Sequence, residues 1–481
     1  MFKTTIVLLI FSMTLAAQTP EDVFSKYDQY KESSISNRRF KHQDIEKLIK
    51  KFENTGKFKV KEEGKSILGK SIYSLEIGTG PVHILLWSQM HGDEATATMA
   101  LMDLFHFFVA DDEFNPIREQ ILSNATLYFI PMLNPDGAEI FTRRNALGVD
   151  LNRDALRLQS PEARILKNKR DETQADFGFN LHDQGRVYSV GYSPKQATIS
   201  FLAPAFNYEQ EINEVRASAM QVIGQLDRVL QNYIPGHVAK YSDEFEPRAF
   251  GDNITKWGTS LILIESGGYP QDRDKQFIRR MNFLSILSSF VFITNESYKR
   301  ETLKGYEQLP FNDRLFFDLL ITGMKINKGG IDYTIDLAVN QDEVDYNSHK
   351  DYYLQGKVEE VGDLSIFYGY ETFDASGYQA LPGKVYPKVL TAKKLATLDQ
   401  LQLLKEGYLF LKVKGEMKAE EKPILNILSA KGEAPAMNFR IGNAANFVLS
   451  KEGKVEYVVI NGFLVDLDSY EGGVYGGVFI K

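Results

Sequence analysis

The chain has 481 residues, of which 43% are hydrophobic and 25% charged, and its formal net charge is −8 at pH 7. This length predicts two domains rather than one ordinary core, and the acidic balance without a basic cluster argues against nucleic acid as a partner. The sequence has no cysteine, which excludes disulfides, thiolate metal sites and a cysteine nucleophile.

The first segment has the pattern of a secretory signal peptide. Lys3 precedes an apolar run over residues 6–17, which ends at the small pair Ala16-Ala17, and this order is typical of a cleaved export signal. The run is shorter than the roughly 20 residues that a membrane span needs, and no second run of that length follows. We therefore expect residues 1–17 to be removed and the protein to be exported, to the periplasm or beyond, without a membrane span.

Apolar runs and turn signals then alternate as far as residue 300. They predict strands over residues 82–87, 125–133, 177–181 and 261–264, and helices over 95–109 and 209–233. The strands are apolar throughout, which indicates burial on both faces of a sheet. This alternation predicts an α/β fold with a mixed, mostly parallel central sheet that is flanked by helices.

The pattern changes after residue 300. We expect a helical linker over residues 301–325, with its helix over 306–324, and then an accessory β-rich domain over 326–481. Asn461-Gly462 lies between two short apolar runs, which is a strong hairpin signal. Residues 446–467 faintly resemble the small β-sandwich beside the barrel of metal-dependent amidohydrolases. No such barrel is present, so we expect a domain that packs on the α/β domain.

His91 and Glu94 lie three positions apart, between the strand that ends at Trp87 and the helix predicted from Ala95. Side chains at positions i and i+3 in the first turn of a helix point to one spot. An imidazole and a carboxylate there would supply two of the three protein ligands of a catalytic zinc site. The same pair also occurs at ordinary solvated helix starts, so the motif needs further partners.

Two more candidates follow apolar strands. His182 comes directly after residues 177–181, and Glu265 comes directly after residues 261–264. Functional sites of open α/β sheets form at the carboxyl ends of the strands, so we expect both side chains near His91. A carboxylate at the end of a buried strand is costly without a partner or a role. Glu265 is therefore either half of an ion pair or a general base.

A polar loop carries five further candidates: Arg143, Arg144, Asp150, Asn152 and Arg153. Arginine binds carboxylates with two parallel hydrogen bonds, and arginines near a zinc site suit a substrate carboxylate and a developing oxyanion. For this segment alone, a solvated charged loop is the simpler interpretation.

Together these motifs resemble the ordered motif series of the zinc metallocarboxypeptidase (carboxypeptidase A-like) family, as in a secreted bacterial member. The resemblance covers roughly residues 37–300, which would be the catalytic domain. The order and spacing of six elements make it specific. These elements are His91-x-x-Glu94, Asn134-Pro135-Asp136-Gly137, Arg143, the run from Gly148 to Arg153, Leu181-His182 and Ile264-Glu265.

The resemblance implies one zinc ion per chain. His91, Glu94 and His182 would hold this Zn²⁺, and Glu265 would be the catalytic glutamate. Asp150 would orient the imidazole of His91.

The resemblance also implies how the substrate is bound. Arg143 would polarise the scissile carbonyl, with its neighbour Arg144 as the competing candidate for this role. Asn152 and Arg153 would bind the C-terminal carboxylate. Tyr241 stands at a suitable distance before the catalytic glutamate to cap the substrate, although no motif surrounds it.

We therefore expect a zinc-dependent metallocarboxypeptidase that hydrolyses the C-terminal peptide bond of peptides, with Glu265 as general base for a metal-activated water. Its substrate would be a peptide or a small amide with a free carboxylate. Two alternatives remain open: a zinc-dependent amidase or deacylase that acts on cell-wall peptides or N-acyl amino acids, and a non-catalytic peptide-binding module on the same fold.

Overall fold

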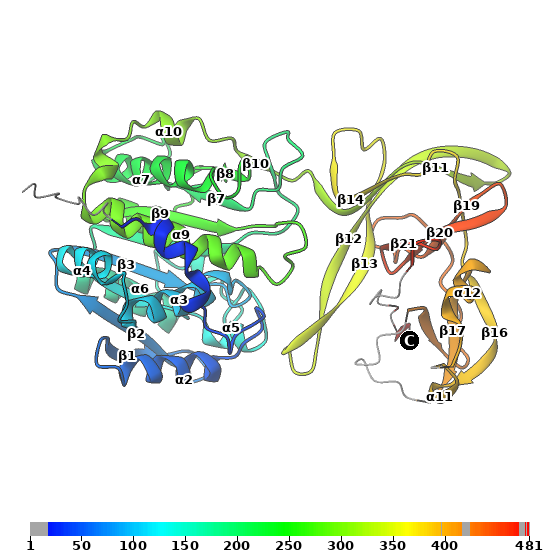
Figure 1. Ribbon diagram of the computed structural model, residues 1–481, viewed down its shortest axis with the longest axis horizontal. Helices are drawn as coiled ribbons and strands as arrows, with labels where there is room; N and C mark the ends of the chain where they lie inside the picture. The colour runs from blue at the N-terminus through cyan, green and yellow to red at the C-terminus, as the bar shows by residue number, and fades with distance from the viewer. Residues whose placement is uncertain (1–17, 396, 416–423, 471–476, 478, 481) are drawn as a thin grey trace, which may run out of the picture.

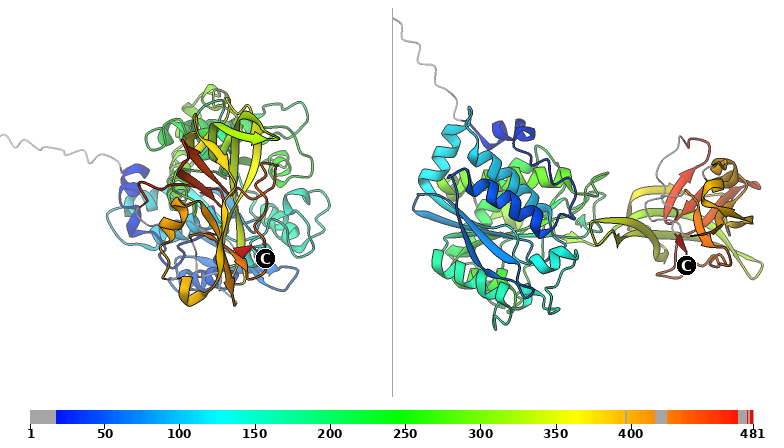
Figure 2. Two further views of the ribbon diagram at one scale, coloured as in Figure 1. Left: turned by 90° about the vertical axis from the view of Figure 1, so that its right-hand side faces the viewer. Right: turned by 90° about the horizontal axis from the view of Figure 1, so that it is seen from below.

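The protein consists of an α/β part and a β-rich part that lie side by side along the long axis (Figures 1 and 2). The computed structural model describes residues 18–395, 397–415, 424–470, 477 and 479–480. The expected signal peptide, residues 1–17, lies outside the described residues.

An eight-stranded mixed sheet forms the centre of the α/β part, with the strand order β1-β2-β4-β3-β5-β9-β7-β8. The four central strands β4, β3, β5 and β9 run parallel, whereas β1 and β2 on one side, and β7 next to β9, form antiparallel pairs. The expected fold class is thereby confirmed. The bounds are β1 (Lys59–Lys65), β2 (Ser71–Gly78), β3 (Val82–Ser88), β4 (Ala125–Ile130), β5 (Phe177–Asp183), β7 (Ile199–Leu202), β8 (Val238–Lys240) and β9 (Ser260–Ser266).

Helices cover both faces of this sheet, which explains why its strands are apolar throughout. Alternate residues of β3 point in opposite directions: Ile84 and Leu86 belong to the core on one face, and Leu85 and Trp87 to the core on the other. The first core includes α2 (His42–Glu53), α3 (Thr96–Val109), α4 (Asn115–Asn124), α7 (Glu214–Leu230) and α9 (Gln276–Thr294). The second includes α6 (Pro161–Thr173) and α8 (Phe250–Lys256).

Helix α9 is the core helix of the α/β part. It is the one helix among the described residues that is long and apolar enough to cross a membrane, and 78% of its apolar window is buried inside the protein. A buried salt bridge joins Arg279 of α9 to Asp103 of α3, and the hydroxyl of Tyr27 donates to the same carboxylate at 2.6 Å. These contacts tie the N-terminal segment to the two helices.

The β-rich part contains two sheets. In the larger, the order is β13-β12-β11-β15-β19-β20-β21, with β14 paired to β11, and in the smaller it is β16-β17-β18-β22. The expected hairpin at Asn461-Gly462 joins β20 to β21. The bounds are β11 (Phe316–Lys328), β12 (Ile331–Tyr346), β13 (Asp351–Gly362), β14 (Tyr368–Asp374), β15 (Gln379–Leu381), β16 (Lys384–Thr391), β17 (Tyr408–Lys414), β18 (Asn426–Ser429), β19 (Phe447–Lys451), β20 (Lys454–Ile460), β21 (Phe463–Asp466) and β22 (Phe479–Ile480).

The expected helical linker over residues 301–325 is wrong for most of its length. Within it, α10 (Lys304–Glu307) is a single short helix, and β10 (Asn312–Asp313) pairs with β6 (Ser189–Val190) of the α/β part. From Phe316 onwards the chain is strand β11, which lies between β12 and β14. A short apolar run fits a helix or a buried strand equally well, and here the neighbouring strands decide.

Candidate metal centre

The candidate residues meet at the carboxyl ends of the central parallel strands. His182 and Glu265 are paired in register on β5 and β9, next to each other, and β3 lies on the other side of β5. His91 and Glu94 occupy the loop that leaves β3 before α3 begins at Thr96. The three strand ends thus bring together side chains that are far apart in the sequence.

The sharp turn after β3 depends on a close contact with α5 (Pro135–Glu139). A Cβ atom on Gly92 would lie 2.1 Å from the carbonyl carbon of Gly137, so only glycine allows this approach. Asn134 caps α5 by accepting a hydrogen bond from the backbone N–H of Gly137 at 2.9 Å. The Asn-Pro-Asp-Gly motif therefore forms the surface on which the loop with His91 and Glu94 rests.

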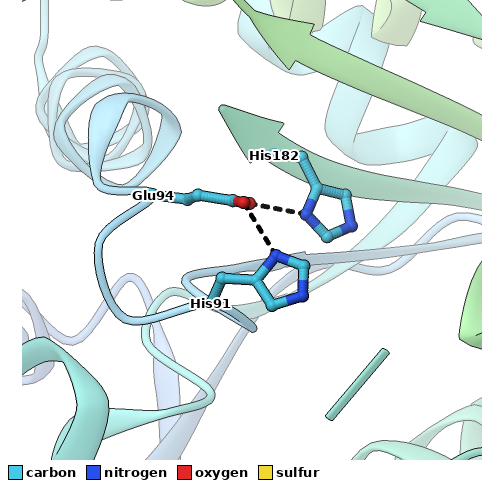
Figure 3. A group of neighbouring side chains, drawn as sticks. All are labelled: His91, Glu94 and His182. Carbon is cyan, nitrogen blue, oxygen red and sulfur yellow. Dashed lines mark hydrogen bonds and ion pairs between the residues drawn. The ribbon is translucent and has the colours of Figure 1, made fainter. Parts of the chain in front are cut away.

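The carboxylate of Glu94 faces both imidazole rings and contacts one nitrogen of each (Figure 3). Its Oε1 is 2.8 Å from Nδ1 of His91, and its Oε2 is 2.6 Å from Nδ1 of His182. One potential ligand atom from each of the three residues lies within 4.8 Å of the others, and all three residues are buried. The structure therefore brings the three predicted metal ligands together.

Asp150 fixes the orientation of His91. Its Oδ1 is 3.0 Å from Nε2 of the imidazole, so Nε2–H donates outward and Nδ1 faces Glu94. Burial lowers the pKa of His91, but the negative charge of Glu94 and the hydrogen bonds to Asp150 and Glu94 outweigh it and raise this pKa to about 9. A cation is thus favoured between Nδ1 and the carboxylate, and it can be a proton or a metal ion.

His182 is held in a different way. Burial lowers its pKa, and its Nε2 is a buried atom without a hydrogen-bond partner among the described residues. A neutral imidazole can bind a metal ion through Nδ1 when its one proton lies on Nε2. Two imidazole nitrogens and one carboxylate make the donor set of catalytic zinc sites with an open fourth position, so the residues present fit zinc.

Arg143 reaches this cluster from the edge. Its Nε donates to Oδ2 of Asp150 at 3.0 Å and its Nη1 to Oε1 of Glu94 at 3.2 Å, while 42% of its side chain is exposed. Arg144 is exposed and donates to the carbonyl oxygen of Gly148 at 3.0 Å. Of the two competing arginines, the structure brings Arg143 to the cluster and Arg144 to the surface.

Glu265 is half-buried, and its carboxylate forms no hydrogen bond or ion pair with any described residue. Burial raises its pKa well above the usual value, and the negative charge of nearby Glu94 raises it further. A carboxyl group in this environment readily holds a proton. This is the property that a general base needs when it must later return the proton.

Asn152 and Arg153 lie beside the cluster but already have partners. The amide oxygen of Asn152 accepts from the backbone N–H of Phe250 at 2.9 Å, which leaves its Nδ2 as donor. Nε of Arg153 lies 3.2 Å from Oε2 of Glu246, and 37% of the arginine side chain is exposed. A substrate carboxylate at this arginine would compete with Glu246.

Tyr241 lies near Glu265, whose negative charge disfavours ionisation of the phenol. Burial raises the pKa of Tyr241 to about 12, with further contributions from Tyr188 and from the charge of Glu265. The centroids of the rings of Tyr188 and Tyr241 are 6.5 Å apart. The position of Tyr241 near the cluster follows from β8, which pairs with β7, the neighbour of β9.

The sequence analysis missed Lys275. This buried lysine donates to the carbonyl oxygen of Ser266 at 2.7 Å and to that of Gln184 at 3.1 Å, and its Nζ is 3.2 Å from Oδ2 of Asp183. It thereby ties the carboxyl ends of β5 and β9, next to His182 and Glu265. A lysine in a polar loop carries no sequence signal of such a role, because only the fold brings its partners together.

Comparisons with known proteins agree with these motifs. The sequence profile of the zinc carboxypeptidase family, Peptidase_M14, matches residues 45–186. Carboxypeptidase SOL1 of Arabidopsis thaliana is 34% identical over 119 residues, which are 23% of this chain and 24% of that protein. Carboxypeptidase D of Drosophila melanogaster is 26% identical over 163 residues, 27% of this chain and 12% of that protein. This chain thus spans a quarter or less of these curated relatives.

Among solved structures, a metallo-carboxypeptidase from Burkholderia cenocepacia is similar with a TM-score of 0.44 and 15% sequence identity, over 54% of this chain and 70% of that chain. The carboxypeptidase A of Helicoverpa armigera has a TM-score of 0.39 and 16% identity, over 58% of this chain and 81% of that chain.

Proposed function

Because residues 45–186 match the sequence profile of the zinc carboxypeptidase family, we propose that this protein is a zinc-dependent metallocarboxypeptidase that releases the C-terminal residue of peptides. The observation that carries the proposal is the meeting of Nδ1 of His91 and Nδ1 of His182 at the carboxylate of Glu94, beside Glu265. The rest of the site supplies a candidate base, Glu265, and an arginine donor, Arg143.

His91, Glu94 and His182 would hold one zinc ion per chain. When bound, zinc would act as a Lewis acid that polarises the scissile carbonyl and lowers the pKa of a water molecule. By accepting from Nε2–H at 3.0 Å, Asp150 holds Nδ1 of His91 toward Glu94, so that Nδ1 is the nitrogen that would give up its proton to bind zinc. Outer partners of this kind set the tautomer and the ring orientation of a metal ligand.

Glu265 would take the proton from the attacking water and pass it to the leaving amine. Its raised pKa, caused by burial and by the charge of Glu94, favours the protonated state between these two transfers. Its lack of any hydrogen-bonding partner among the described residues leaves both carboxylate oxygens available. General acid–base catalysis of this kind contributes about 10²–10⁴-fold to a reaction rate.

Arg143 would donate to the oxygen that becomes negatively charged when the carbonyl is attacked. Its Nη1 lies 3.2 Å from the carboxylate of Glu94, and Asp150 holds the other side of its guanidinium. A donor that is already in place needs no reorganisation at the moment of reaction, which makes such contacts strong contributors to catalysis.

Arg153 and the free amide group of Asn152 would bind the terminal carboxylate of the substrate, with Tyr241 beside it. Asn152 and Arg153 follow Asp150 in the same short 3₁₀ turn, Leu151–Arg153, so the distance between the metal ligands and this cationic group is fixed. A peptide held by its C-terminus would place its last amide bond at the cluster. Fixed orientation of this kind explains exopeptidase cleavage.

A panel of matched peptides tests the proposal. The purified, zinc-loaded protein is expected to remove single residues from peptides with a free C-terminus and to leave the same peptides with an amidated C-terminus intact. Equal cleavage of both sets would contradict the carboxypeptidase assignment and would favour an amidase. Release of an acyl group from N-acyl amino acids, without peptide cleavage, would favour a deacylase.

We also propose that the protein is exported. The support is the Lys3 start, the short apolar run and the Ala16-Ala17 pair in the sequence. N-terminal sequencing of the protein recovered from outside the cytoplasm should begin near Gln18, and an intact Met1 on that protein would contradict the proposal.

A further inference from the structure

A segment of the α/β part contacts the β-rich part on one side and the residues that precede Arg143 on the other. Strands β12 and β13 form a long hairpin whose turn, residues 347–350, reaches the segment from Asn37 to Lys41 of the α/β part. This segment in turn contacts the residues between α5 and Arg143. The accessory part is therefore connected to the candidate site through this segment and the residues that precede Arg143.

Arg39 is the centre of this connection. It is a buried residue, 3% exposed, and its guanidinium lies between two aromatic rings, 4.0 Å from the centroid of Phe141 and 4.7 Å from that of Tyr352. It also forms ion pairs with Asp345 and, at 2.8 Å, with Glu343 of the hairpin. A buried cation with two carboxylates and two aromatic faces has a single well-defined position.

Phe141 needs this support because of its backbone. Its φ is +49°, a left-handed conformation that costs a residue with a bulky side chain about 1–2 kcal/mol. Phe141 lies two residues before Arg143, and the backbone N–H of Thr142 between them donates to the carbonyl oxygen of Gly137 at 2.9 Å. The position of the ring of Phe141 thus sets where the chain delivers Arg143.

Lys41 provides a second connection of the same kind. Its Nζ donates at 2.7 Å to the carbonyl oxygen of Glu139, the last residue of α5, and at 2.7 Å to that of His349 in the hairpin turn. The lysine is 6% exposed and lies between the hairpin and α5. The segment from Glu139 to Arg143 is therefore held at Glu139 and at Phe141 by groups that also bind the hairpin.

Tyr352 extends the connection to the other side of the site. Its ring stacks on Arg39, and its hydroxyl donates to Oδ1 of Asp274 at 3.1 Å. Asp274 belongs to the loop after Glu265, in which Arg273 also binds Asp318 of β11 at 3.1 Å. The hairpin thus holds two loops at once, the loop that leads to Arg143 and the loop that leaves Glu265.

We propose that the β12–β13 hairpin contributes to catalysis by positioning a residue of the active site. Arg39 is the positioning residue: its guanidinium stacks on Phe141 and thereby places Arg143 for transition-state stabilisation. The proposal rests on the proposed function. Arg39 itself touches none of the candidate ligands, so its effect passes through Phe141 and the two residues that follow. The β-rich part then contributes to catalysis.

The first experiment separates turnover from binding. Arg39→Lys keeps the charge but removes the planar group that stacks on Phe141, and Tyr352→Leu removes the hairpin side of the same stack. Both substitutions should lower kcat about tenfold or more, because an error of about 1 Å in the position of Arg143 can cost about 10²-fold in rate. KM and zinc content should stay unchanged, because the contact that Arg143 loses is made only in the transition state. Asp342→Asn is the matched control on the same hairpin, since Asp342 pairs with Lys357 at the surface.

A double-mutant cycle tests the route. If Arg39 acts through Arg143, Arg39→Lys should lower kcat in the wild type but have little further effect in an Arg143→Lys background. Equal fold losses in both backgrounds, or a rise in KM without a change in kcat, would overturn the proposal. If the wild type has no carboxypeptidase activity at all, the proposed function fails. The positioning role of Arg39 is then tested by hydrogen exchange, which needs no turnover.

A measurement without turnover then decides the positioning role. Amide hydrogen exchange of residues 139–145 should become faster in Arg39→Lys and in Tyr352→Leu but not in Asp342→Asn, with the exchange of α9 unchanged as evidence of an intact core. Unchanged exchange at residues 139–145 in both stack variants would overturn the proposal, whatever the substrate of the enzyme.

Discussion

His182 and Glu265 are direct neighbours on the parallel strands β5 and β9, in register with each other at the carboxyl end of the sheet. In a parallel pair, residues in register project their side chains to the same face. A candidate metal ligand and a candidate general base are therefore held side by side by backbone pairing alone. This relationship joins two residues that are far apart in the sequence, with β7, α7, β8 and α8 between them.

Removal of His182 should abolish metal binding. Its Nδ1 is one of three candidate donors, and a site with two remaining donors is too weak to retain zinc through purification. We expect His182→Ala to contain no stoichiometric zinc by elemental analysis. His83→Gln is the control, because His83 lies near the start of β3 and hydrogen-bonds to the carbonyl oxygen of Thr173. Full zinc content in His182→Ala would refute the site.

Zinc uptake should release a proton. In the metal-free protein the pKa of His91 is about 9, because Glu94 and Asp150 outweigh the lowering effect of burial, so the imidazole is charged at pH 7.5. Zinc needs the neutral form, so binding should release about one proton per ion at pH 7.5 and fewer above pH 9. Apparent zinc affinity should correspondingly rise with pH up to about 9.

Calorimetry in buffers with different ionisation enthalpies measures this proton release. Asp150→Asn serves as the comparison: loss of the carboxylate lowers the pKa of His91, and fewer protons should leave at pH 7.5. Zinc binding without any proton release in the wild type would show that His91 is already neutral and would contradict the prediction.

Glu265→Gln should separate binding from catalysis. The amide has nearly the same shape but cannot accept a proton, so kcat should fall by about 10²–10⁴-fold. Zinc content and thermal stability should stay the same or stability should rise slightly, since a carboxyl group without partners is removed from a buried environment. Nearly unchanged turnover would place the general base elsewhere.

Arg153 and Glu246 form an ion pair, and substitutions of the two residues should change KM in opposite directions. Arg153→Ala should raise KM for peptides with a free C-terminus about tenfold or more, because a charge-assisted contact to the carboxylate is lost. Glu246→Gln should lower KM, because Nε of Arg153 loses the carboxylate that now lies 3.2 Å away. Steady-state kinetics on one peptide series measures both, and equal KM values in all three proteins would place the carboxylate site elsewhere.

The physical reasons for the expected strands also explain where sequence reasoning failed. Strands β3, β5 and β9 were predictable because helices cover both faces and leave each strand apolar throughout. The run from Phe316 to Met324 is also mostly apolar, yet it was predicted as a helix. Its strand conformation depends on hydrogen bonds to β12 and β14, and such partners, distant in sequence, leave no trace in local periodicity.

The choice between Arg143 and Arg144 was also beyond the sequence. The two residues are adjacent, and either fits the motif. The left-handed turn at Phe141 and the carboxylate of Asp150 bring Arg143 to Glu94, whereas Arg144 reaches Gly148 at the surface. A shift of the turn at Phe141 by one residue would exchange the positions of the two arginines. Only the side chains that pack around this turn fix it.

The sequence by itself determined which chemical groups are available and at which strand ends they occur: two imidazoles and two carboxylates, with no cysteine to compete for a metal. It did so because ligand types, apolar runs and turn residues are local properties of the chain. The tertiary structure decided that these groups converge at Glu94, that Arg143 faces them, and that Arg39 joins the site to the β12–β13 hairpin. Those relationships depend on distances between segments that are far apart in the chain, and only packing and strand pairing set such distances.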